Sequence, residues 1–384
     1  MKMLYVVPEP FPDRRARFIQ IINTCDALAG AGAEVILITG LRRGYTVESA
    51  LKYYGIVANP GLKIVRLPML RKGDNSFLRF SWHGIFHYAL LTYLMSYTMD
   101  TGKQTVLFTR HLKLAGFLLR YRNLLRHPLI FEAHEIFSRS GETKSANTIR
   151  RLEERVYRLS DALVFISKKL EADLKAAFPE VREKPCTVTH DGVRREWLTM
   201  RREGKKKYIC YTGSLYGWKG IDVLISAMQY LPEETLLVVG GGNRLTELQK
   251  GAEAKGVKNI VFTGEIQHSS VPDYLAQAKI AILPNIECGP SVFSSPLKLF
   301  EYMASGLPIV ASDLPVFREI LSHKKNSILV EPGNPRALAS GINFLIQNPA
   351  VASDISAQAN ADIKNFTYER RAERILDLMR RLCR

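Results

Sequence analysis

Two lysines in the second half of the chain stand where they could bind phosphate. Lys219 ends the loop "GSLYGWK", which follows a β-rich run, and it precedes a helix that the sequence predicts to begin near Ile221. Lys298 lies in "SSPLKLFEYMASG", where Ser295 is the expected N-cap, Pro296 the first helical residue and Lys298 the third. Loop N–H groups, a helix N-terminus and a lysine together form a common phosphate site.

The alternative for Lys298 is a solvated side chain without a ligand. The N-terminus of a helix carries a partial positive charge, so a lysine in the first turn costs about 0.3–1 kcal/mol. This stretch alone does not decide between the two interpretations. The glycine spacing around Lys219 matches neither the Walker loop nor the Rossmann fingerprint. The turn "GGGNRL" at 240–245 is by itself more typical of a structural turn than of a ligand site.

Polar residues also follow predicted strands in the first half of the chain. His134 and Glu135 come directly after the buried run "LIFEA". A single histidine is more often structural than catalytic, although the end of a strand is where α/β domains bind ligands. The loop after the first strand, "PEPFPDRRARF", carries Arg14 and Arg15, which could contact an acceptor or a phosphate.

Short β-rich runs alternate with amphipathic helical patterns in both halves of the chain. The runs lie at 3–7, 33–39, 63–67, 105–109, 129–133 and 162–166, and then at 208–214, 235–242, 259–264, 280–285, 308–312 and 327–330. Strands separated by helices predict parallel sheets with right-handed crossovers. The expected fold class is therefore α/β, with two doubly wound parallel-sheet domains that face each other across a cleft. The charged segment 195–210 is the expected linker.

The composition argues against several classes of protein. The chain has 384 residues, of which 46% are hydrophobic and 24% charged, as expected for two globular domains and not for a disordered chain. The five cysteines are scattered, which favours a reducing compartment over a disulfide framework or a zinc site. The start "MKMLYVVPEP" is expected to form the first strand and not a signal peptide.

The net charge of +17 is concentrated in the first half of the chain. The segment from Pro60 to His127 holds 11 basic and 2 acidic residues, a field that attracts anionic lipid, nucleic acid or phosphorylated ligands. Within it, residues 80–99 are uncharged and rich in aromatic side chains, which favours a helix at a membrane interface over a membrane span. The alternative is a core helix. Nucleic acid is not an expected partner, because the basic residues are not interleaved with aromatic ones on a recognisable module.

The motifs, in their order and spacing, resemble those of the retaining glycosyltransferases of glycosyltransferase family 4, which have the GT-B fold of two Rossmann-like domains. The likeness covers nearly the whole chain and is densest from Ser160 to Glu331. "YTGSLYGWKG" resembles "GRLxxxKG", "VVGGGNRLTEL" resembles "vGdGpxxxxL", and "KLFEYMASGLPIVAS" resembles "xxLEAMAxGxPVVAS". The segments "SDALVFISKKLEADL", "VTHDGVRREW" and "VFTGEIQHSSVPDYLAQAKIAILPN" also resemble family motifs.

The resemblance implies that the chain is divided into three parts. Residues 1–198 would form the N-terminal, acceptor-side Rossmann-like domain, and residues 199–364 the nucleotide-sugar-binding domain. Residues 365–384 would form a helix that crosses back to the N-terminal domain.

The resemblance also implies roles for single residues. Lys219 and Lys298 would bind the diphosphate of a nucleotide-sugar donor, Glu301 would bind the ribose hydroxyls, and His134 would contact the donor sugar; these four are the expected catalytic residues. The other expected donor-binding residues are Gly213, Ser214, Gly241, Glu265, Ile266, Ser294, Ser295 and Leu297. Arg14, Arg15 and Glu135 are the expected residues on the acceptor side. No metal site and no cofactor other than the donor substrate is expected.

Two positions depart from the family pattern. Phe293 stands where the first of the paired glutamates is usual, and Ser214 replaces the arginine of "GRLxxxKG". Our hypothesis is that Lys298 supplies the positive charge missing at Ser214. The alternative is that donor binding has been lost.

The expected function is retaining, metal-independent transfer of a sugar from a nucleoside-diphosphate sugar to a lipid-linked or envelope glycan acceptor. The expected location is cytoplasmic, bound peripherally to the anionic inner face of the cell membrane. One alternative is a sugar-nucleotide epimerase of the same fold, which would need acid and base carboxylates that the sequence does not show. Another is a catalytically silent, membrane-associated partner of another glycosyltransferase.

Overall fold

The computed structural model describes residues 1–13, 15–69, 82–97, 104–140, 143–199, 204, 206–293 and 295–383. The chain forms two compact units: unit 1 is Met1–His190 with Tyr368–Arg384, and unit 2 is Asp191–Thr367. The predicted boundaries at 198/199 and 364/365 therefore lie a few residues from the places where the chain passes between units. Arg14 and Ser294, two of the predicted site residues, lie outside the described residues.

Unit 1 contains a parallel sheet of seven strands in the order β3-β2-β1-β4-β5-β6-β7. The strands are β1 (Lys2–Phe11), β2 (Glu34–Leu41), β3 (Leu62–Leu67), β4 (Thr105–Thr109), β5 (Leu129–Ala133), β6 (Ala162–Phe165) and β7 (Cys186–Val188). All six β-rich runs predicted in this half form strands. The edge strand β7 was not predicted, because three half-buried residues carry too short a hydrophobic pattern.

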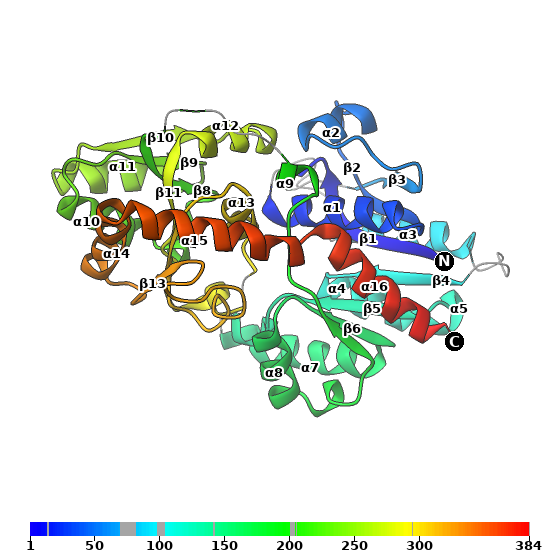
Figure 1. Ribbon diagram of the computed structural model, residues 1–384. Helices are drawn as coiled ribbons and strands as arrows, with labels where there is room; N and C mark the ends of the chain where they lie inside the picture. The colour runs from blue at the N-terminus through cyan, green and yellow to red at the C-terminus, as the bar shows by residue number, and fades with distance from the viewer. Residues whose placement is uncertain are drawn as a thin grey trace. The chain divides into compact units, whose positions relative to one another are not determined.

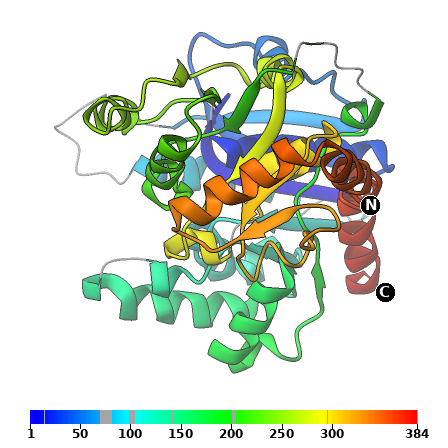
Figure 2. The same ribbon diagram turned by 60° about the vertical axis from the view of Figure 1, so that its left-hand side comes forward.

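Nine α-helices belong to the described part of unit 1. They are α1 (Ala16–Gly30), α2 (Val47–Tyr53), α3 (Trp82–Met95), α4 (Leu112–Arg120), α5 (Arg122–Leu125), α6 (Phe137–Ser140), α7 (Thr143–Leu159), α8 (Lys168–Ala177) and α16 (Tyr368–Leu382). The last of these packs against the first, α1 (Figure 1). Both chain ends thus lie in unit 1 (Figure 2), where the Gln104 side chain donates to the carbonyl of Cys383 at 2.8 Å.

The helix α3 carries the uncharged segment expected at a membrane interface. Phe86, Leu90 and Leu94 on one face are fully buried in unit 1, whereas Tyr88 on another is 66% exposed. The described part of the segment is therefore a half-buried helix, between the two alternatives that the sequence left open. No helix within the described residues has the length and apolar character needed to cross a membrane.

Unit 2 contains a parallel sheet of six strands in the order β10-β9-β8-β11-β12-β13. The strands are β8 (Tyr208–Thr212), β9 (Leu236–Val239), β10 (Ile260–Gly264), β11 (Ala278–Leu283), β12 (Ile309–Ser312) and β13 (Ile328–Val330). They coincide with the six β-rich runs predicted in this half. The two parallel sheets confirm the predicted α/β class with two doubly wound domains.

Helices cover both faces of the six-stranded sheet. They are α9 (Glu196–Thr199), α10 (Ile221–Ala227), α11 (Leu245–Ala254), α12 (Val271–Ala276), α13 (Leu297–Ala304), α14 (Pro335–Gln347) and α15 (Pro349–Asp362). Neighbouring strand residues point to opposite faces: Cys210 packs with α12 and α13, whereas Ile209 and Tyr211 pack with α10, α11 and α14.

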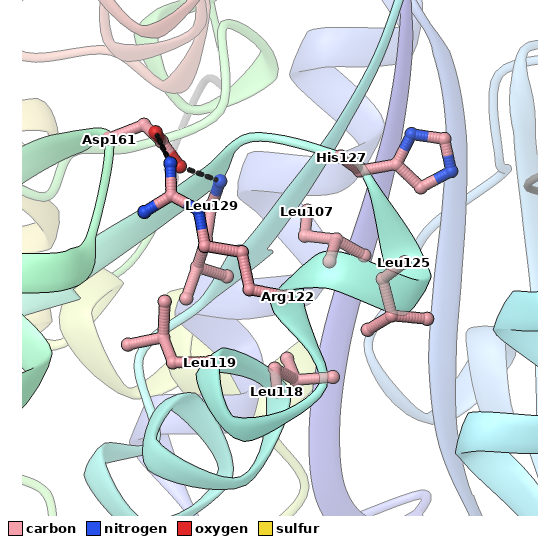
Figure 3. A pocket seen from close by; sticks show the side chains of 8 residues that line it. All are labelled: Leu107, Leu118, Leu119, Arg122, Leu125, His127, Leu129 and Asp161. Carbon is pink, nitrogen blue, oxygen red and sulfur yellow. Dashed lines mark hydrogen bonds and ion pairs between the residues drawn. The ribbon is translucent and has the colours of Figure 1, made fainter.

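The cavity drawn in Figure 3 lies in unit 1, between α4, α5 and the β4 and β5 strands. Its volume is about 10 Å³, room for roughly one water molecule. Apolar side chains such as Leu118 and Leu125 line it, and the pair of Arg122 and Asp161 closes one side at 2.6 Å. It is too small to bind a nucleotide or a sugar.

Candidate functional site

The candidate site of unit 2 lies at the carboxyl ends of β8 and β11. These adjacent strands are where the strand order reverses, the usual ligand position in such sheets. The loop after β8 is fixed to the segment after β11: the carbonyl of Trp218 accepts from Ile286 N at 3.2 Å and from Ser291 Oγ at 3.0 Å. Gly220 has a φ of +72°, and a Cβ there would lie 1.8 Å from the carbonyl oxygen of Pro284. Only glycine fits this contact.

The glycine turn after β9 packs against the same loop. Gly240 has a φ of +137°, and a Cβ there would lie 2.2 Å from the carbonyl oxygen of Gly213. The carbonyl of Gly241 accepts from Leu215 N at 3.2 Å, and Gly241 also lies close to the backbone of Glu265 after β10. Four predicted residues, Gly213, Gly241, Glu265 and Ile266, are thus brought to one edge of the sheet.

The start of α13 differs from the predicted one. The helix begins at Leu297, with Pro296 as the N-cap in an extended conformation (ψ 122°). Ser295 is not the N-cap, because its hydroxyl accepts from the backbone N–H of Asp191 at 3.1 Å. Lys298 is accordingly the second helical residue and not the third. Leu297 and Lys298 still lie in the first turn, where backbone N–H groups have no acceptor within the helix.

Lys298 is buried, so it is not the solvated lysine of the alternative interpretation. Its side chain lies over the ring of Tyr211, with Nζ 3.5 Å from the ring centroid. Within the described residues Nζ has no hydrogen-bond partner. A Cβ on Gly213, whose φ is +119°, would lie 3.0 Å from this Nζ, so the amine rests against the glycine backbone.

Lys219 is buried beside it, in the 3-10 turn Gly217–Lys219. Its Nζ lies 3.7 Å from the centroid of the Trp218 ring. Burial lowers the pKa of Lys219 to about 7. Burial and then the charge of Lys219 hold the pKa of Lys298 well below its usual range. Burial thus disfavours the charged form of both amines, and an anion beside them would favour it.

Glu301 lies one turn further along α13 and is also mostly buried. His268 Nε2 donates to Glu301 Oε1 at 2.7 Å. The charge of Glu301 favours the protonated form of Lys298 and so raises the pKa of that lysine, but by less than burial lowers it. The predicted neighbours Lys298 and Glu301 thus interact electrostatically, and a hydrogen bond joins His268 to Glu301.

The two departures from the family pattern have different surroundings. Phe293 is 7% exposed, and this position carries a buried aromatic ring in place of a carboxylate. The Ser214 carbonyl accepts from the Tyr211 hydroxyl at 2.8 Å, and its side chain is half-buried. The tyrosine whose ring lies under Lys298 is therefore fixed by the residue that replaces the family's arginine.

The candidate site of unit 1 lies after β5. His134 Nε2 lies 3.4 Å from Glu132 Oε1, and only 13% of the His134 side chain is exposed. Burial, together with the charges of Arg110 and Arg17, lowers the pKa of His134 well below its usual value. His134 is therefore neutral near pH 7, so it can exchange hydrogen bonds with a hydroxyl group without carrying charge.

Glu132, fully buried, anchors this part of unit 1. It accepts hydrogen bonds from Tyr5 Oη at 3.1 Å and Gln20 Nε2 at 3.2 Å, and it pairs with Arg371 of α16. Arg371 also donates to the carbonyl of Thr189 at 2.7 Å. Burial lowers the pKa of Arg371 to about 10, and at that value the guanidinium stays charged at neutral pH. The strand that ends at His134 is thus fixed from the C-terminal helix.

The predicted acceptor-side residues lie in two places. Glu135 is half-buried directly after His134. Arg15 is the N-cap of α1, and its side chain and backbone N–H both bind Asp13, the backbone N–H at 2.8 Å. Nη2 of Arg17 lies 2.5 Å from Oε1 of Glu9, which is buried. Within the described residues, no group of three or more His, Cys, Asp or Glu is placed to hold a metal ion.

Several residues of these sites were missed by the sequence analysis. They are Tyr211 under Lys298, His268 beside Glu301, and the set around His134, which comprises Arg110, Glu132 and Arg371. His268 could have been found, since it follows a predicted strand at the same edge as Glu265. Arg371 could not, because its partner is 239 residues away in the sequence.

Two family models match consecutive parts of the chain. Residues 20–192 match the model described as "Glycosyl transferase 4-like domain". Residues 198–362 match the model described as "Glycosyl transferases group 1".

Curated proteins with similar sequences carry glycosyltransferase names. An uncharacterized glycosyltransferase of Methanocaldococcus jannaschii is 28% identical over 241 residues, which are 59% of this chain and 60% of that protein. The phosphatidyl-myo-inositol mannosyltransferase of Mycobacterium leprae is 31% identical over 163 residues, 41% of this chain and 42% of that protein. The chain thus spans roughly half the length of the curated relatives it matches.

Solved structures match the whole chain at low sequence identity. Sucrose-phosphate synthase from Thermosynechococcus elongatus has a TM-score of 0.74 and 18% identity, and the match covers 100% of this chain and 99% of that one. Anabaena HepE in complex with UDP-glucose has a TM-score of 0.73 and 16% identity, with 98% and 99% covered. At these identities the likeness shows the fold, and it confirms the predicted GT-B fold.

Proposed function

We propose a function from one established premise: this chain belongs to the group 1 glycosyl transferases, whose two family models cover most of its length. We propose that it transfers a sugar from a nucleoside-diphosphate sugar to an acceptor hydroxyl, with retention of anomeric configuration. In this reaction the bond between the anomeric carbon and the diphosphate oxygen breaks, and the diphosphate leaves with the electron pair. The acceptor oxygen forms the new bond and loses its proton.

The observation that carries this proposal is the pair of buried lysines. Nζ of Lys298 has no hydrogen-bond partner among the described residues, and both amines lie against aromatic rings at the carboxyl edge of the sheet. A buried amine without a partner is costly unless a ligand supplies the opposite charge. A diphosphate would supply it, and the two lysines would then stabilise the negative charge that develops on the leaving group.

Lys298 is proposed to supply the charge that Ser214 lacks. Its amine lies against Gly213, the residue directly before Ser214, which supports this assignment. Lys219, Lys298 and the first-turn N–H groups of α13 would bind the diphosphate, and Glu301 would accept from the ribose. The nucleobase would lie near Glu265 and Ile266. These roles require no metal, and we predict activity in the presence of EDTA.

Unit 1 is proposed to bind the acceptor and the donor sugar. His134, neutral and at the end of β5, would contact the sugar, while Arg15 and Glu135 would lie on the acceptor side. The acceptor is proposed to be a lipid-linked or envelope glycan. One relative is named for a lipid, phosphatidyl-myo-inositol, and the basic first half with the exposed Tyr88 on α3 is consistent with peripheral binding to an anionic membrane.

The experiment that tests the function is a ligand screen followed by a transfer assay. Thermal shifts are measured with a panel of nucleoside diphosphates and nucleotide-sugars, since a ligand at 100 times its dissociation constant adds about 2.7 kcal/mol. A stabilising nucleotide-sugar is then tested for release of its diphosphate. Absence of any stabilising nucleotide would contradict donor binding. Binding without turnover would favour the silent partner of another enzyme, and inversion at a sugar carbon of the bound donor would favour the epimerase.

A further inference from the structure

A histidine to which the sequence motifs assign no role holds the carboxylate of Glu301. His268 lies in the short 3-10 turn after β10, and its Nε2 is 2.7 Å from Glu301 Oε1. The two side chains are 19% and 9% exposed, so water competes little for this hydrogen bond. His268 therefore connects the strand edge near the expected nucleobase position to the helix α13.

His268 is itself held from a second side. The ring of Trp197 on α9 lies against the imidazole, with 6.3 Å between the ring centroids and 34° between their planes. Trp197 is 5% exposed and belongs to the buried cluster around α12 and α13. The turn closes through the hydrogen bond from Ser270 N to the Gln267 carbonyl at 3.0 Å. The imidazole thus contacts the Glu301 carboxylate on one side and the Trp197 ring on another.

The contact uses one of the two carboxylate oxygens of Glu301. A carboxylate can accept about four hydrogen bonds, and the donation from His268 to Oε1 leaves Oε2 for a ligand. Because His268 already restricts the Glu301 side chain, less conformational freedom is lost when a ligand binds. The free oxygen can accept a hydrogen bond from a hydroxyl group of a ligand.

We propose that His268 is a positioning residue that makes this protein select ribose: it fixes Glu301 so that the free oxygen accepts from a ribose hydroxyl. This inference rests on the proposed function, because it assigns the sugar of the nucleotide to Glu301. It predicts that the selectivity between a ribonucleotide and a deoxyribonucleotide depends on a residue that touches neither.

A competing arrangement predicts the opposite effect of removing His268 on nucleotide affinity. If His268 occupied the oxygen that the ribose needs, the nucleotide would have to displace it, and removing His268 would strengthen binding. The sign of the effect of His268→Ala on affinity therefore separates a positioning residue from a competitor.

The test is titration calorimetry with the nucleoside diphosphate that binds best and with its 2′-deoxy and 3′-deoxy forms. The wild-type protein should prefer the ribose form over at least one deoxy form. His268→Ala should weaken binding of the ribose form about 10-fold and change binding of the disfavoured deoxy form by less than about 2-fold. His268→Gln, whose side-chain amide can also donate to Glu301, should restore most of the selectivity.

Two controls keep the outcome clear. Ser269→Ala changes the exposed neighbour in the same turn and should leave the selectivity unchanged. Glu301→Gln should abolish the selectivity in the presence of His268. Intact nucleotide binding with unchanged or increased selectivity in folded His268→Ala would overturn this inference alone. Failure of the wild-type protein to bind any nucleoside diphosphate would overturn the proposed function and this inference with it.

Discussion

Arg371 in unit 1 and Lys298 in unit 2 are both buried cations, yet their surroundings differ. Arg371 pairs with Glu132 and donates to backbone carbonyls, whereas Nζ of Lys298 has no hydrogen-bond partner within the described residues and lies over an aromatic ring. The arginine keeps its charge at neutral pH, but burial favours the neutral form of the lysine. The first arrangement holds a structure together, and the second would be completed by the diphosphate that we propose as its ligand.

The largest effect is expected on protein stability, when the ion pair of Arg371 and Glu132 in unit 1 is broken. Arg371→Ala leaves the carboxylate of Glu132 buried without its cation, so the free energy of unfolding should fall by about 3–5 kcal/mol. Urea denaturation measures this change in the free energy of unfolding. The double variant Arg371→Leu with Glu132→Leu removes both charges and should recover part of the loss. Equal stability of Arg371→Ala and the wild-type protein would show that the pair is not structural.

Substitutions at the two lysines of unit 2 should change ligand affinity. Lys219→Ala and Lys298→Ala should each weaken binding of a nucleoside diphosphate by about 1.5–3 kcal/mol, the range for hydrogen bonds to charged groups. Binding of the nucleoside should change little, because the lysines are assigned to the phosphates. Calorimetry with Lys250→Ala, an exposed lysine of the same unit, serves as the control. If Ser214→Arg fails to rescue Lys298→Ala in part, the compensation hypothesis loses its support.

The pH dependence follows from the pKa of Lys219, about 7 in the free protein. A diphosphate binds the protonated amine, so above pH 7 binding must include uptake of a proton. The affinity for a nucleoside diphosphate should therefore fall between pH 7 and pH 9, by up to about tenfold per pH unit for one proton. Lys219→Arg, which stays charged, should flatten this dependence. A constant affinity over this range would show that Lys219 is already charged in the free protein.

The smallest effect is expected on the stability of the protein without ligand. Lys298→Met replaces a buried amine by an apolar side chain of similar length, and the free energy of unfolding should rise by about 1 kcal/mol at pH 7. The pKa of Lys298 is lowered in the folded protein. At pH values below the usual pKa of a lysine, the unfolded chain therefore binds more protons than the folded one. The gain should therefore grow as the pH falls from 10 towards 7. A loss of stability would mean that the contact with Tyr211 outweighs the burial of the amine.

Local elements could be predicted from the sequence better than long-range contacts. The short β-rich runs located every strand of the described residues except the short β7, and the resemblance assigned Lys219, Lys298 and Glu301 to one expected donor site. The N-cap at Ser295 was wrong because a tertiary hydrogen bond to Asp191 engaged the hydroxyl. The pairs His268–Glu301 and Arg371–Glu132 join residues 33 and 239 positions apart, and neither pattern nor propensity reports such contacts.

The position of α16 has a consequence for the order in which the protein can fold during synthesis. Unit 1 takes its first 190 residues from the start of the chain and its last helix from Tyr368 onward. The ribosome therefore completes all of unit 2 before it releases the residue that neutralises Glu132. Until then the carboxylate of Glu132 lacks its cation, and the final packing of unit 1 waits for α16.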